Sequence, residues 1–145
     1  MNLKTLSVVG LIIKIAAIMA MFYRQCLFGT GPVTVGVQVA AILLMIWARL
    51  TFGGRSFHAV ANPTAGGLVT TGPYHYFRHP IYAAILWFGL AGAAAHLSLE
   101  SVLLALVLVI GAALRMFAEE HLIVQRYPEY AAYAAKTPRV IPFVF

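Results

Sequence analysis

The sequence predicts an all-α, polytopic membrane protein with about four transmembrane helices. Hydrophobic residues make up 62% of the chain and charged residues 10%, whereas a soluble domain has roughly 45–50% apolar and about 25% charged residues. The apolar residues lie in four runs, and a run of about 20 residues suffices to cross a bilayer. The 145 residues are expected to form a single membrane-embedded domain over residues 1–145.

The first predicted span covers about Leu6 to Tyr23. Lys14 lies in the middle of this run, and a lysine near the bilayer centre costs roughly 2.5–3.5 kcal/mol on insertion scales. Its side chain should therefore face protein or a wet cavity. Two roles are open: a structural hydrogen bond to a neighbouring helix, or a direct role in a site.

The second predicted span covers about Val33 to Leu50, after a short turn at residues 28–32. Trp47 and Arg49 near its end are typical interfacial anchors. A long connection, Thr51 to His79, follows. Connections of this length are usually functional or disordered. This one ends in a polar cluster, which favours a functional segment.

The third predicted span covers about Pro80 to Ala95. Proline is well tolerated at the first helical position, because its missing N–H would have no intrahelical partner there. Gly89 and Gly92 give this span a small-residue face for close helix packing.

The fourth predicted span covers about Ser101 to Phe117 and follows a tight hairpin at residues 96–100. The third and fourth spans should therefore be antiparallel neighbours. The run continues without a helix breaker as far as Ile123, so the helix is expected to extend beyond the membrane surface.

The distribution of positive charge predicts the orientation in the membrane. Four spans place both termini and the long connection on one side, and that side carries eight Lys and Arg residues. The other side has Arg24, and Lys14 lies within the membrane. By the positive-inside rule, the eight face the cytoplasm, with the protein in the cell (inner) membrane. Topology thus explains the net charge of +6, and no nucleic-acid partner is predicted. The eight residues are Lys4, Arg49, Arg55, Arg78, Arg115, Arg126, Lys136 and Arg139.

Two polar clusters lie on the predicted cytoplasmic side, at residues 68–82 and 115–120. Arg115 and Glu119 are four residues apart, hence neighbours on one helix face, and Glu120 points about 100° away. Acids near a helix C-terminus oppose the helix macrodipole, so a cationic partner is expected to meet them. The alternative is a surface ion pair, which contributes about 0.3–0.5 kcal/mol.

The aromatic residues and histidines admit two interpretations. The aromatic side chains between residues 74 and 82 fit either an interfacial belt or a site, and the belt is favoured for Tyr76 and Phe77. His79 before Pro80 fits either a hydrogen-bonded interfacial residue or a ligand. The histidines and the single cysteine show no spacing typical of metal ligands, so no metal site is predicted.

Residues 68–82 contain LVTTGPY followed by RHPIY, which resembles the signature of the isoprenylcysteine carboxyl methyltransferase family. The second half of the chain is similar to this family as well. It contains Arg115, Glu119-Glu120, several tyrosines and then Pro138-Arg139. The resemblance covers about residues 68–143, and the wider group includes the phospholipid N-methyltransferases.

The resemblance implies a membrane methyltransferase that uses S-adenosylmethionine. Its cofactor pocket would lie at the cytoplasmic end of the bundle, between residues 53–79 and the C-terminal helix and tail. Arg115 would orient the acceptor, a lipophilic carboxylate that enters from the bilayer between the helices. Glu119 would bind the cofactor, and these two are the predicted catalytic residues. The other cofactor contacts implied are Leu68, Val69, Gly72, Tyr74, His79, Pro80, Tyr82 and Glu120.

Two other classes of protein remain open. Membrane sterol and steroid reductases resemble this chain in their C-terminal region but use NADPH, and they are usually longer. A non-enzymatic membrane subunit with a decayed motif would be expected to lose site residues. Arg115, Glu119, His79 and Tyr82 are all present.

Overall fold

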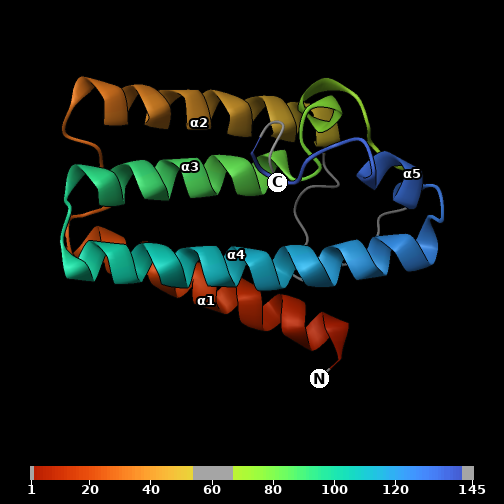
Figure 1. Cartoon of the computed structure of the whole chain (residues 1–145), viewed down its shortest axis with the longest axis horizontal. Coiled ribbons are helices and arrows are strands. Elements are labelled where there is room, and N and C mark those ends of the chain that lie inside the picture. Colours follow the sequence, from red (N-terminus) through yellow and green to blue (C-terminus); the bar gives the residue numbers. More distant parts are fainter. Residues whose placement is uncertain (1, 54–66, 142–145) are drawn as a thin grey trace.

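The computed structural model of the chain describes residues 2–53 and 67–141 (Figure 1). Within these ranges the regular elements are all helices, as predicted. They are α1 (Leu3–Tyr23), α2 (Pro32–Phe52), the short 3-10 helix η2 (Gly72–His75), α3 (Pro80–Ala95), α4 (Leu99–Arg126) and α5 (Tyr130–Ala134).

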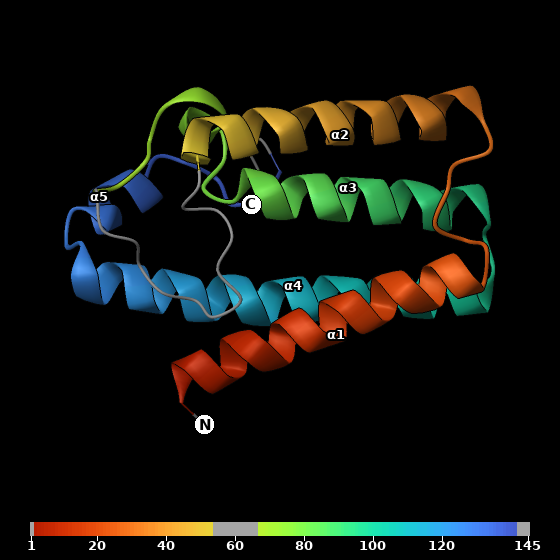
Figure 2. The same ribbon diagram turned by 180° about the vertical axis from the view of Figure 1, so that it is seen from behind.

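The helices α2, α3 and α4 lie side by side, and α1 crosses α4 on its far side in Figure 1. The principal contacts are of α1 with α4, of α2 with α3, and of α3 with α4. Consecutive long helices run in opposite directions, so the predicted antiparallel pairing of the third and fourth helices is confirmed. The start of α1, residues 67–79 and α5 consequently lie at one end of the bundle (Figure 2). We call this end the site end.

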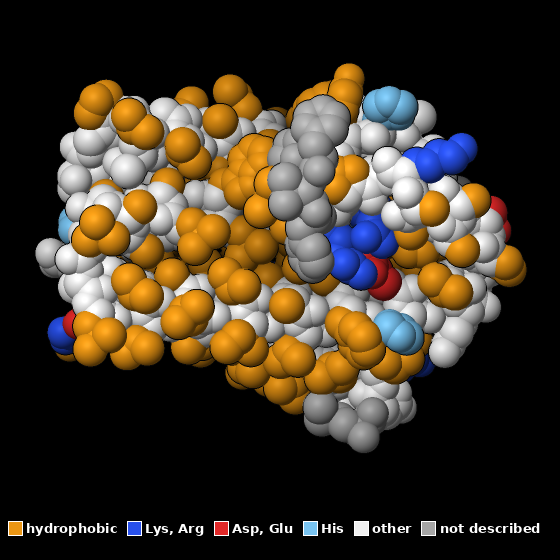
Figure 3. Space-filling model, viewed as in Figure 1, with side chains coloured by type: hydrophobic (Ala, Val, Ile, Leu, Met, Phe, Trp, Pro, Cys, Tyr) orange, Lys and Arg blue, Asp and Glu red, His pale blue; other side chains and the backbone are white. Residues whose placement is uncertain are grey.

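Three of these helices, α1, α2 and α4, are long and apolar enough to cross a membrane, and α3 is a shorter apolar helix. Figure 3 shows hydrophobic side chains over the length of the bundle and charged side chains near its ends. Exposed residues such as Ile12, Leu43 and Leu103 are 59%, 62% and 52% accessible. Such a surface suits lipid rather than water, and the chain is an integral membrane protein.

The helix boundaries differ from the predicted ones where side chains cap the helices. The Asn2 carboxamide accepts a hydrogen bond from the Lys4 backbone N–H at 3.1 Å, so α1 begins at Leu3. Ser98 Oγ accepts a hydrogen bond from the Ser101 backbone N–H at 3.1 Å. The helix α4 therefore begins at Leu99 rather than Ser101, and the hairpin before it is shorter than predicted. Short polar side chains at the N-cap satisfy backbone donors that the helix itself leaves unpaired.

Small residues bring α1 and α4 into close contact. A Cβ added at Gly111 would lie 2.7 Å from the backbone nitrogen of Lys14, and one added at Gly10 would lie 2.9 Å from that of Arg115. This approach sets Lys14 against Gly111 and Arg115 against Gly10. The predicted small-residue face of α3 is also confirmed, because Gly89 packs on Leu108.

Candidate functional site

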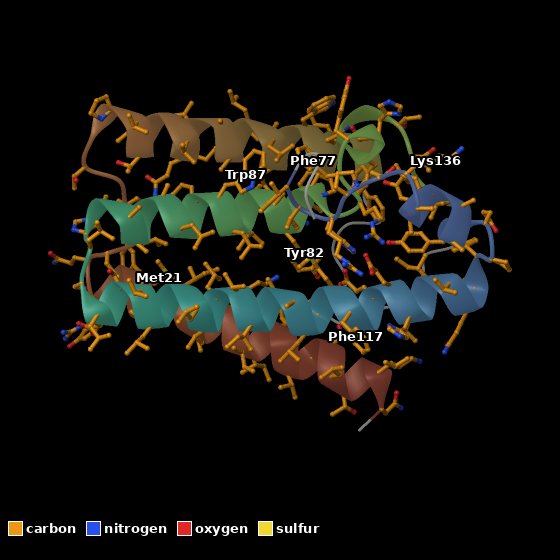
Figure 4. The ribbon with its side chains drawn as sticks, viewed as in Figure 1. Met21, Phe77, Tyr82, Trp87, Phe117 and Lys136 are labelled. Carbon is orange, nitrogen blue, oxygen red and sulfur yellow. The ribbon has the colours of Figure 1, made fainter. Side chains whose placement is uncertain are left out.

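Tyr82 joins α3 to α4 at the site end. Arg115 Nε donates to the Tyr82 hydroxyl oxygen at 2.7 Å, and that hydroxyl donates to Glu119 Oε1 at 2.7 Å. Arg115 Nε also lies 3.0 Å from Glu119 Oε1, so the contact predicted from the spacing of four residues is confirmed. Figure 4 shows Tyr82 in the space between α3 and α4. We call Tyr82, Arg115 and Glu119 the acid cluster.

Lys14 reaches the acid cluster from α1. Its ammonium lies 4.5 Å from the centroid of the Tyr82 ring, and the residue is 7% exposed. A cation over an aromatic face is attracted by the quadrupole of the ring. Within residues 2–53 and 67–141, the structure shows this ring contact and no hydrogen bond for the Lys14 ammonium.

Glu120 belongs to a second group of side chains. Its carboxylate lies 2.9 Å from Arg78 Nη1, 3.0 Å from His79 Nε2 and 3.1 Å from Arg139 Nη2. The Tyr130 hydroxyl donates to the same carboxylate at 3.3 Å. The cationic partner expected near the helix end is therefore supplied, for Glu120, by the chain itself. We call these five residues the tail cluster.

Backbone hydrogen bonds fasten the tail to the segment before α3. The Arg78 backbone N–H donates to the Pro138 carbonyl at 2.8 Å, and the His79 N–H donates to the Arg139 carbonyl at 3.0 Å. The Tyr133 hydroxyl donates to the Tyr74 carbonyl. Its hydroxyl is protonated at neutral pH, and burial raises the pKa of Tyr133 to about 12, which keeps the hydroxyl a donor into the alkaline range.

The remaining predicted site residues line the segment that enters α3. Pro80 is buried at the first position of α3, and Tyr74 is buried in η2 with its ring 5.4 Å from that of Phe52. Gly72 has φ +59, a conformation that favours glycine. Leu68 and Val69 are half-buried. The rest of the predicted pocket wall, residues 54–66, lies outside the described residues, as do residues 142–143 of the predicted resemblance.

The sequence assigned Arg78, Arg139 and Tyr130 no role in the site, yet all three meet Glu120. Arg78 and Arg139 lie within the motifs and carry charge opposite to Glu120, a signal that could have paired them. The Nε of Arg78 is buried and has no hydrogen-bond partner in the described part of the chain. For Lys14, the structure shows a ring contact with α3 beside the acid cluster rather than the structural hydrogen bond considered above.

Comparison with known proteins connects this geometry to a family. The sequence profile of the isoprenylcysteine carboxyl methyltransferase family matches residues 34–125, more than half of the chain. The match includes Tyr82, Arg115, Glu119 and Glu120. Lys14 and Arg139 lie outside it.

Two curated relatives are similar over 74% of this chain. The nickel-cobalt-cadmium resistance protein NccN of Alcaligenes xylosoxydans xylosoxydans is 35% identical over 111 residues. The cobalt-zinc-cadmium resistance protein CzcN of Cupriavidus metallidurans is 36% identical over 110 residues. The matched region is 46% of each relative, so the chain spans about half the length of the curated relatives it matches. No solved structure matches the chain.

Proposed function

Because the chain belongs to the isoprenylcysteine carboxyl methyltransferase family, we propose that it transfers a methyl group from S-adenosylmethionine to a lipophilic carboxylate in the membrane. The observation that carries this proposal is the acid cluster. A carboxylate and a guanidinium are held together by one tyrosine hydroxyl at the site end of an apolar bundle. These groups suit a cationic cofactor and an anionic acceptor.

The chemistry of the site fits S-adenosylmethionine, which has a sulfonium, an ammonium and a carboxylate. Glu119 offers a carboxylate to the cationic groups, and the Tyr82 ring offers an aromatic face. The buried Nε of Arg78 is a donor suited to the carboxylate of the cofactor. Leu68, Val69, Gly72, Tyr74 and Pro80 remain the proposed surroundings of the adenosyl part.

Glu120 and His79 are proposed here to act indirectly. The Glu120 carboxylate already meets two arginines and His79, so it is well placed to hold the tail over the site. We therefore assign Glu120 and His79 as positioning residues. This assignment revises the cofactor contacts that the family resemblance implies for them.

When bound, S-adenosylmethionine supplies an electrophilic methyl group. Arg115 orients the acceptor carboxylate, which is already a nucleophile and needs no base to remove a proton. Hydrogen bonds to Tyr82 and Glu119 fix the Arg115 side chain. It therefore loses little conformational entropy when the acceptor binds. Holding two reactants in line can contribute about 7–11 kcal/mol to lowering a barrier, and this alignment is the main task of the site.

We propose that the site end faces the cytoplasm. Lys4, Arg78 and Arg139 belong to that end, in keeping with the positive-inside rule. A soluble cofactor would then reach the acid cluster from the cytoplasm, and a lipophilic acceptor would reach it from the bilayer.

The names of the two relatives describe metal resistance. We propose that methylation by this chain takes place in that setting, on a membrane amphiphile. Metal tolerance of cells carrying Glu119→Gln, compared with cells carrying the wild-type chain, tests this setting separately from the reaction.

The reaction is tested with the purified protein in detergent and tritiated S-adenosylmethionine. The acceptor is a carboxylic acid that carries an S-farnesyl thioether. We expect a tritiated methyl ester that releases methanol in base. The farnesylated alcohol of the same length serves as the control acceptor and should remain unlabelled. Labelling of the alcohol but not the acid would contradict the proposal.

A further inference from the structure

An apolar groove lies between α1, α2 and α3. It encloses about 240 Å³ and is lined almost entirely by hydrocarbon. The floor is α3, with Ala84, Ile85 and Phe88, and α1 contributes Ile18. The lining from α2 consists of Ala41, Ile42, Met45 and Ile46.

The helix faces that line the groove carry polar residues about one turn nearer the site end, on all three helices. Lys14 lies four residues from Ile18 on α1, and Tyr82 lies three residues from Ile85 on α3. Residues three or four apart share a helix face and are about one turn from each other. In both cases the site residue lies nearer the site end, because α1 and α3 begin there.

The α2 side of the groove shows the same spacing between a lining residue and a polar residue. Arg49 lies four residues after Met45 on α2, which ends at the site end. The lining of the groove is apolar, and by helical spacing Lys14, Tyr82 and Arg49 lie about one turn beyond it on the same three helices.

The charges at this end of the groove do not balance within the acid cluster. Glu119 is the carboxylate there, and it is already paired with Arg115. Lys14 is 93% removed from contact with solvent, and its ammonium meets the Tyr82 ring. A charge withdrawn from water requires a compensating partner. The carboxylate of the cofactor is assigned to the buried Nε of Arg78, so the ligand complementary to Lys14 is a second anion.

We propose that Lys14 binds the carboxylate of the acceptor, and that the apolar tail of this amphiphile lies in the groove between α1, α2 and α3. This inference rests on the proposed function and extends it to a residue outside the matched family region. Lys14 makes the protein bind acids more tightly than neutral amphiphiles, and the groove holds the apolar tail.

The test is direct binding by scintillation proximity, with tritiated dodecanoate and tritiated dodecanol as probes of equal tail length. Wild-type protein should bind dodecanoate at least about tenfold more tightly than dodecanol, as expected for a charge-assisted contact in a buried site. Lys14→Met should bring the two affinities close together, and Lys14→Arg should keep the preference for the acid. Lys4→Met, on an exposed residue of the same helix, is the matched control and should behave like wild type.

Equal affinities of wild-type protein for dodecanoate and dodecanol would overturn the inference, whether or not any Lys14 variant folds. A preference for the acid that survives in Lys14→Met would overturn it as well. Each protein is also titrated with S-adenosylhomocysteine, which should bind all of them alike. Failure of that ligand to bind wild type would contradict the methyltransferase and leave the acid-selective groove standing.

A second pair of variants tests the tail. Ile85→Trp fills the groove. It should weaken the binding of dodecanoate and of dodecanol by the same factor, because the two probes share the same tail. Leu106→Trp, on an outward face of α4 that is 52% exposed, should change neither. Unchanged binding of both probes to Ile85→Trp would place the tail elsewhere and overturn this part of the inference.

Discussion

Glu119 and Glu120 are adjacent in the chain, yet their carboxylates belong to different clusters. Glu119 accepts a hydrogen bond from the Tyr82 hydroxyl at 2.7 Å, whereas Glu120 pairs with Arg78 at 2.9 Å. Successive side chains on a helix diverge by about 100°, so one acid faces the bundle and the other faces the tail. One helix end thereby contributes to the acid cluster and also fastens the C-terminal tail.

Glu119→Gln removes the negative charge while keeping the size of the side chain. Because this carboxylate is the proposed partner of the cationic groups of the cofactor, the Kd for S-adenosylhomocysteine should rise at least about tenfold. Calorimetric titration measures this change. Glu129→Gln, on an exposed residue, is the control, and equal Kd values for wild type and Glu119→Gln would count against the assignment.

Arg115→Lys keeps the positive charge but loses the planar guanidinium that contacts both Tyr82 and Glu119. Lysine cannot reproduce that fixed geometry. Turnover of methyl ester should fall about 100-fold, as expected when a reactant is displaced by about 1 Å. Binding of S-adenosylhomocysteine should change little. Loss of cofactor binding together with turnover would show that Arg115 supports the cofactor instead of the acceptor.

Glu120→Gln should destabilise the protein more than it affects chemistry. It leaves Arg78, His79 and Arg139 around a neutral side chain. Removing one partner of a fully buried ion pair costs about 3–5 kcal/mol, and this partly buried group should cost less than that. The thermal midpoint of the detergent-solubilised protein should drop clearly, with Glu129→Gln unchanged. If Glu120→Gln had the same thermal midpoint as the wild type, the tail would be held by other contacts.

Gly111→Ala tests the close approach of α1 and α4. The added methyl group would meet the Lys14 backbone nitrogen at 2.7 Å, and such overpacking costs about 1–3 kcal/mol. Gly36→Ala, with open space around it, should instead stabilise α2 by up to about 1 kcal/mol through helix propensity. Thermal midpoints should therefore move in opposite directions. A rise for both variants would contradict the contact between the helices.

The sequence allowed the four apolar helices α1 to α4 to be predicted because each is a predominantly apolar run without an internal helix breaker. The first residues of α1 and α4 could not be placed from hydropathy, since Asn2 and Ser98 decide them through hydrogen bonds to backbone N–H groups. The start of α3 at Pro80 was predicted, because proline suits the first helical position. The short helices η2 and α5 were not predicted. Their turns are too short to give a periodic signal, and a tertiary contact between Tyr133 and Tyr74 holds them together.

In the candidate site, the Arg115–Glu119 contact followed from helical spacing alone. The partners of Glu120 did not, because Arg139 lies 19 residues away and reaches it only after the tail folds back. The place of Lys14 depends on the close packing of Gly10 and Gly111, which no local pattern in α1 reveals. Contacts within one helix could thus be predicted, whereas those made by the tail and by α1 required the folded bundle.

The central claim is that this membrane protein binds S-adenosylmethionine for methyl transfer. Calorimetric titration of the detergent-purified wild-type protein with S-adenosylhomocysteine, and in parallel with NADPH, tests it most directly. We predict micromolar binding of S-adenosylhomocysteine and no heat from NADPH. Binding of NADPH alone would contradict the claim and place the chain with the reductases, and binding of neither would favour a non-enzymatic membrane subunit.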